Sequence, residues 1–143
     1  MKRFSSSRRG FAAILSLALL VSLSATAFAA SGDAVATYSE DTSVSGQTYV
    51  STGKDENAIL VTGGSVRLDS ISVTRSSSDS TGGDDSSFYG VGATILATGG
   101  TAYISGSTIT TSAAGGAGVF AYGDGTIYID ATTLSPGQDT SGG

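Results

Sequence analysis

The amino-acid sequence predicts an all-β fold, a parallel β-helix of about three coils, from a repeat, an alternation and a set of turn glycines. Residues 58–74 read AILVTGGSVRLDSISVT, residues 94–110 read TILATGGTAYISGSTIT, and a third, partial copy follows. Within each copy, apolar and polar residues alternate in short β-branched runs, which is typical of strands. Glycine-rich turns end these runs, and self-similarity at a fixed period indicates stacked coils.

The copies align on a glycine that precedes the second strand of each coil. These glycines are Gly64, Gly100 and Gly125, and they are 36 and 25 residues apart. The first interval is longer because of one insertion around residues 76–87, which read SSSDSTGGDDSS. Without this insertion the two repeats have nearly the same length, so we expect one coil per repeat.

Each repeat carries a row of apolar residues that a single coil cannot bury by itself. Stacking places equivalent residues over one another, so that Leu68, Ile104 and Ile129 are predicted to form one inward column. The predicted inward residues of the three repeats are Val66, Leu68, Ile71, Val73, Ala102, Ile104, Ile109, Ile127, Ile129 and Leu134.

The first strand of the third repeat aligns with the others when Asp124 is treated as an extra turn residue. In that alignment, Val119 and Ala121 are predicted to point inward. Phe120 and Tyr122 are predicted to point outward, because successive side chains of a strand alternate between its two faces.

Residues 1–29 have the three-part pattern of a helical secretory signal peptide. A cationic start precedes an apolar run at residues 11–23, which is shorter than the ~20 residues that span a bilayer. Ala27 and Ala29 occupy the A-x-A positions, so we expect cleavage after Ala29 and a mature chain that begins at Ala30. We therefore expect a secreted or cell-surface protein without membrane insertion after signal removal; an uncleaved anchor is the alternative.

The export route has two candidates. Residues 7–11, SRRGF, resemble the twin-arginine motif. Ala12 and Ala13 then replace the residues that usually follow in that motif, and the apolar run is rich in leucine. We therefore favour general secretion.

The mature chain divides into two parts. Residues 30–47 are polar, acidic and weakly patterned, so we predict a flexible leader or an N-terminal cap. Residues 48–143 hold the repeats and end on DTSGG, where a further coil is expected to open. We therefore expect the chain to be an N-terminal fragment of a longer repeat protein.

The composition excludes several classes of function. The mature part carries all 12 acidic residues and only three cations, which disfavours nucleic acid and anionic membranes as partners. The mature part contains no cysteine and no histidine. This excludes thiol nucleophiles, histidine-based triads and ordinary zinc sites, and no cofactor or metal is expected.

The repeats resemble those of repetitive right-handed parallel β-helix proteins on bacterial surfaces, which are adhesin-like and share the superfold of pectate lyases. The resemblance depends on STGKDENAILVTGG, SSFYGVGATILATGG and GVFAYGDGTIYI, and it covers roughly residues 44–143. It implies a right-handed parallel β-helix with a structural or adhesive role at the cell surface rather than catalysis.

The strongest candidate site is an outward column of side chains. If Val66 and Leu68 point inward, the flanking residues point outward, and the predicted ligand-binding residues are Arg67, Asp69, Tyr103, Tyr128 and Asp130. Two tyrosines one strand separation apart, ~4.8 Å, are predicted to form a flat aromatic platform flanked by acids. Such a surface suits the glycans of a host or neighbouring cell. The alternative is that these side chains only stabilise the sheet by stacking.

Other functions remain as alternatives. The chain is the N-terminal part of a polysaccharide lyase or hydrolase if catalytic coils lie downstream, with Arg67 as a conceivable base, but Arg67 has no basic neighbours. Adjacent Asp84 and Asp85 point apart on an extended chain, and with Asp79 they match no calcium-loop spacing, so a solvated loop is predicted. A third alternative is a purely structural segment of a longer stalk.

Overall fold

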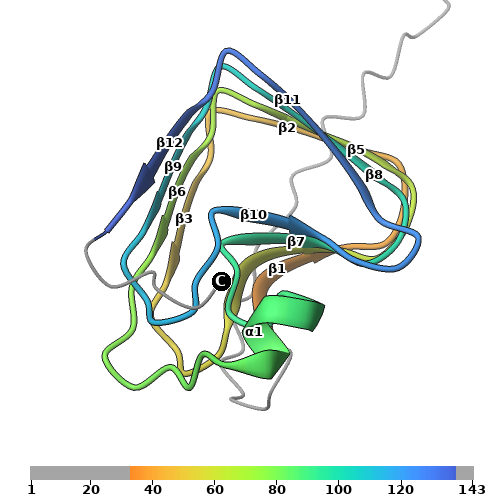
Figure 1. Ribbon diagram of the computed structural model, residues 1–143. Coiled ribbons are helices and arrows are strands. Elements are labelled where there is room, and N and C mark those ends of the chain that lie inside the picture. The colour runs from red at the N-terminus through yellow and green to blue at the C-terminus, as the bar shows by residue number, and fades with distance from the viewer. Residues whose placement is uncertain (1–32, 138–143) are drawn as a thin grey trace, which may run out of the picture.

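The computed structural model describes residues 33–137 and shows a right-handed parallel β-helix of four coils (Figure 1). Each coil contributes one strand to each of three parallel sheets, which form the sides of a triangle in the end-on view of Figure 1. Sheet A contains β1 (Ala34–Tyr38), β4 (Asn57–Val61), β7 (Ile95–Ala97) and β10 (Val119–Ala121). Sheet B contains β2 (Thr42–Ser45), β5 (Ser65–Asp69), β8 (Thr101–Ser105) and β11 (Thr126–Asp130). Sheet C contains β3 (Thr48–Ser51), β6 (Ser72–Arg75), β9 (Thr108–Thr111) and β12 (Thr133–Pro136). The predicted fold class is confirmed.

The register between coils is the one that the repeat predicts. Leu68 pairs with Ile104, and Ile104 pairs with Ile129, so equivalent residues lie directly over one another. The alignment of the third repeat is confirmed too, because Val119 pairs with Ile95 and Ala121 pairs with Ala97.

The stack begins earlier in the chain than the sequence indicated. Residues 34–45 were expected to belong to a flexible leader or a cap, but they form β1 and β2, and with β3 they complete a first coil. The described residues therefore form four coils, where the sequence predicted about three. The apolar alternation in these two strands is weak, since it depends on Ala36 and Tyr38 in β1 and on Val44 in β2. Hydrogen bonds between the parallel strands hold the first coil on the second in spite of this weak apolar pattern. One example is the backbone N–H of Asn57, which donates to the carbonyl of Asp33 at 2.8 Å.

Two tyrosines fill the interior of this first coil. Tyr38 and Tyr49 are both buried, and their hydroxyl oxygens are 2.7 Å apart in a hydrogen bond. Burial, together with this bond, raises the pKa of Tyr49, so its hydroxyl stays protonated. Bulky aromatic side chains here occupy the space that aliphatic residues fill in later coils.

The core is a single apolar cluster that runs along the axis through the first three coils. The inward residues of the last coil point the same way but are less covered. Ile104 is 1% exposed, whereas Ile129 is 40% exposed and Leu134 is similarly open. The reason is positional, because no further coil among the described residues packs on β10, β11 and β12.

The insertion between the second and third coils contains a short helix, α1 (Asp84–Tyr89), which lies against the outer face of sheet A (Figure 1). A loop was predicted for residues 76–87, and the prediction was wrong for residues 84–87. Asp84 and Asp85 are nevertheless exposed to solvent, as expected. A helix this short has too few residues to show a 3.6-residue period, and packing on the sheet stabilises it instead.

The predicted signal peptide, with its cleavage positions Ala27, Ala29 and Ala30, lies outside the described residues. Within residues 33–137, no helix has the length and apolar character needed to span a membrane.

Candidate functional site

The outer face of sheet B brings the five predicted site residues together. Strand alternation directs residues 67, 103 and 128 outward in one row, because these positions pair across β5, β8 and β11. Residues 69, 105 and 130 form a parallel row beside it. A shallow depression of about 220 Å³ lies over the two rows, and the residues that line it are Arg67, Asp69, Tyr103, Ile104, Ser105, Tyr128, Ile129 and Asp130.

The first row is a stack that we name the tyrosine ladder: Arg67, Tyr103 and Tyr128. The ring centroids of Tyr103 and Tyr128 are 5.2 Å apart, and the ring planes differ by 13°. The guanidinium carbon of Arg67 lies 4.8 Å from the centroid of the Tyr103 ring, within the range of a cation–π contact. The ladder thus joins a cation and two aromatic rings along the axis of the β-helix.

This geometry differs from the flat platform that was expected. Two nearly parallel rings with centroids this close must overlap face to face, because rings lying side by side would clash. Tyr103 therefore has one face against Arg67 and the other against Tyr128. Among residues 33–137, no strand pairs with the other side of β11, and Tyr128 is 57% exposed. The parts of the ladder that face solvent are therefore one face of the Tyr128 ring and the edges of the Tyr103 and Tyr128 rings.

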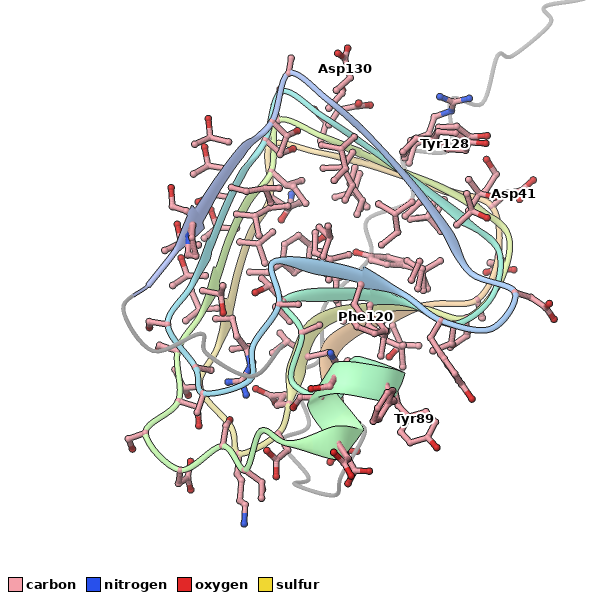
Figure 2. All side chains as sticks on the ribbon, in the orientation of Figure 1. Asp41, Tyr89, Phe120, Tyr128 and Asp130 are labelled. Carbon is pink, nitrogen blue, oxygen red and sulfur yellow. The ribbon has the colours of Figure 1, made fainter. Side chains whose placement is uncertain are left out.

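The second row carries the carboxylates. The hydroxyl of Ser105 donates a hydrogen bond to Oδ1 of Asp69 at 2.5 Å, which fixes that carboxylate between two coils. Asp130 continues the row in the last coil, is exposed, and projects at the corner between sheets B and C (Figure 2). Carboxylate oxygens accept hydrogen bonds, so this row complements the apolar face of Tyr128 a short distance away.

The described residues offer no evident place for a metal ion. Among residues 33–137, no group of three or more acidic side chains has the spacing to hold one. The acidic residues of the insertion, Asp79, Asp84 and Asp85, thus form no such group.

A buried polar cluster lies under the insertion, and we did not predict it. Arg75 is completely buried and donates hydrogen bonds to the carbonyls of Gly92 and Ser76 and to the hydroxyl of Ser80. Burial lowers the pKa of the Arg75 guanidinium, and the nearby carboxylates of Glu56, Asp55 and Asp79 act in the opposite direction. The sequence contained a signal for this position, since Ile71, Val73 and Arg75 follow the inward alternation.

Two further side chains attach the insertion to the stack. The amide of Asn57, also buried, donates to the carbonyls of Gly90 and Ala93 at 3.0 and 2.7 Å. Asp55 accepts hydrogen bonds from the amide and hydroxyl of Thr81. Partial burial acts to raise the pKa of Asp55, but these bonds, with Lys54 and Arg75 nearby, outweigh it and hold that pKa below its usual value.

Comparison of the chain with models of known protein families, with curated protein sequences and with solved structures finds no match.

Proposed function

We propose that this chain is a secreted or cell-surface adhesion protein without catalytic activity, which contacts glycans on sheet B. The observation that supports the proposal is the convergence of an open aromatic face, two carboxylates and a guanidinium around one depression. The signal-peptide pattern of residues 1–29 supports an extracellular location for this surface.

The chemistry of the depression suits a sugar ring. The free face of Tyr128 accepts the C–H groups of one side of a pyranose, as aromatic faces accept other polarised C–H edges. Asp69 and Asp130 accept hydrogen bonds from sugar hydroxyls, and Arg67 donates them. Because the mature chain is strongly acidic, neutral glycans are expected to bind in preference to anionic ones.

The fold suits this role because it holds the site on strands rather than on loops. Arg67, Tyr103 and Tyr128 belong to paired strands of three successive coils. The ladder contacts hold the ring of Tyr128 in place before a ligand arrives, which reduces the entropy lost on binding.

The test is a glycan array probed with the purified protein, followed by titration of the glycans that bind. Tyr128→Ala is expected to weaken binding about two- to tenfold, since stacking on an aromatic ring contributes about 0.5–1.5 kcal/mol. Tyr103→Ala/Tyr128→Ala is expected to abolish measurable binding to this site. The matched control is Tyr128→Phe, which keeps the ring face and is expected to bind nearly as well as the wild type.

Far-ultraviolet circular dichroism of each variant separates lost binding from lost folding. Binding to neutral glycans that is unchanged in Tyr103→Ala/Tyr128→Ala would remove the ladder from the proposal. Failure of the wild type to bind any glycan would contradict the proposed function itself.

A further inference from the structure

The outer face of sheet A carries the insertion between the second and third coils, which includes α1. The insertion places Phe88 and Tyr89 at the end of α1, and the ring of Tyr89 contacts the ring of Tyr122 from the turn after β10. We name these three residues the aromatic cluster. They are 63%, 49% and 45% exposed respectively, so about half of each side chain faces solvent. Figure 2 shows Tyr89 projecting from α1 on the outside of the molecule. Insertions in repeat proteins commonly form loops on the binding face.

The rings of this cluster are arranged differently from those of the tyrosine ladder. The centroids of Tyr89 and Tyr122 are 5.3 Å apart, and their planes are 89° apart, which is an edge-to-face contact. In such a contact, one ring uses its edge, so neither of its faces is covered by the partner. The other ring uses one face, so its second face is not covered by the partner. In the ladder, by contrast, Tyr103 has both faces occupied. The edge-to-face contact therefore leaves ring faces in the cluster that the partner ring does not cover.

The segment beneath the cluster is held by packing. Gly90 ends α1 with φ +70°, and a Cβ at this position would lie 2.6 Å from the ring of Phe120 and 2.7 Å from Leu96. These two side chains thus fill the space between α1 and sheet A, where Figure 2 labels Phe120. The buried side chains of Asn57 and Arg75 bind the carbonyls of the segment that follows the helix. The exposed rings are therefore positioned by fixed supports and do not depend on a ligand for their arrangement.

Carboxylates accompany the rings. Asp84 and Asp85 precede Phe88 and Tyr89 by four residues, so each ring has an acidic side chain one turn away on the same side of α1. Both carboxylates are exposed. An aromatic face beside a hydrogen-bond acceptor matches the two surfaces of a sugar, its C–H groups and its hydroxyls.

We infer that the aromatic cluster is a second carbohydrate-binding surface, which takes a neutral oligosaccharide and is independent of the tyrosine ladder. The size of the surface favours a sugar over a folded protein. The exposed parts of three aromatic side chains amount to roughly 300 Å², whereas a specific protein interface needs about 800 Å² from each partner. The high content of acidic groups disfavours anionic glycans.

The inference is tested with a panel of neutral hexose and N-acetylhexosamine oligosaccharides, titrated against the purified protein. Phe88→Ala/Tyr122→Ala is expected to lower affinity at least about tenfold for a subset of these sugars. Tyr103→Ala/Tyr128→Ala is expected to leave affinity for that subset unchanged. Val50→Ala is the matched control, because Val50 is similarly exposed but lies on sheet C, and it is expected to bind like the wild type.

The outcomes separate this inference from the proposed function. If Phe88→Ala/Tyr122→Ala binds every sugar as the wild type does, the second surface is overturned while the ladder is untouched. If no neutral sugar binds, or if the cluster captures only a protein, the inference is also overturned. Tyr89→Phe and Tyr122→Phe keep the rings and the packing of α1, and we expect them to retain at least a third of the wild-type affinity.

Discussion

Replacing Ile104 by alanine is expected to lower the free energy of unfolding by about 3–4 kcal/mol. Ile104 is enclosed in the core, between Leu68 of the preceding coil and Ile129 of the next one. The substitution removes three methyl or methylene groups and leaves a cavity that coils on both sides cannot easily fill. The measurement is equilibrium unfolding in urea, with the midpoint and slope compared between the variant and the wild type.

The chain supplies its own control for this prediction. Ile129→Ala makes the same chemical change in the same inward column, one coil further on. Because Ile129 is substantially exposed, we expect a loss below about 1.5 kcal/mol. Equal losses in the two variants would mean that Ile104 is not enclosed between coils, and the stacked core would be wrong.

Replacing Gly100 by alanine is expected to cost more than about 4 kcal/mol, because two penalties combine. Gly100 has φ +67°, where a residue with a Cβ is strained by about 1–2 kcal/mol. An added Cβ would also lie 2.5 Å from the carbonyl carbon of Gly63 and too close to the carbonyl oxygen of Gly64, both in the turn of the preceding coil. These are backbone atoms, so relief requires the two coils to move apart. We expect the variant to lose a large share of its stability, since small domains are stable by only about 5–15 kcal/mol.

Gly46→Ala isolates the first penalty. Gly46 has φ +66°, nearly the value at Gly100, but an added Cβ would meet no atom within 4 Å. We therefore expect a cost of about 1–2 kcal/mol from the backbone conformation alone. Urea unfolding of the two variants together measures the difference. If Gly100→Ala is no less stable than Gly46→Ala, then the turns of successive coils do not press against each other.

The repeated residues made most of the fold predictable. An inward column such as Leu68, Ile104 and Ile129 is visible in the sequence, because each coil must match its neighbours side chain for side chain. The same logic made Val119 and Ala121 predictable once the extra turn residue Asp124 was recognised. Register between coils is therefore encoded locally, in every repeat.

The segments that the sequence did not predict are those whose structure depends on contacts with residues far away in the chain. Residues 34–45 are held in the first coil largely by ladder hydrogen bonds to the second, which leave little trace in composition. The helix α1 is too short for a periodic signal and depends on packing against Leu96 and Phe120. Arg75 continues the inward alternation, but its burial depends on the carbonyl and hydroxyl groups that accept its hydrogen bonds, because an unpaired charge is costly in the interior.

The residues of the candidate site were predictable, but the arrangement of its rings was misjudged. Outward alternation brought Arg67, Tyr103 and Tyr128 into one row. The spacing between strands, ~4.8 Å, is smaller than the width of an aromatic ring, so tyrosines in paired positions must overlap. The stacked ladder thus follows from the same spacing that suggested a platform. The aromatic cluster had no comparable signal, because Tyr89 and Tyr122 meet only after the insertion packs on sheet A.

The central claim is that successive coils lie directly over one another in register, and nuclear Overhauser contacts between methyl groups test it most directly. In the wild-type protein we predict strong contacts from Ile104 to both Leu68 and Ile129, which lie one strand separation away on either side. No contact is predicted between Leu68 and Ile129, because Ile104 separates them. Absence of the first two contacts, or a direct contact between Leu68 and Ile129, would contradict the β-helical stack.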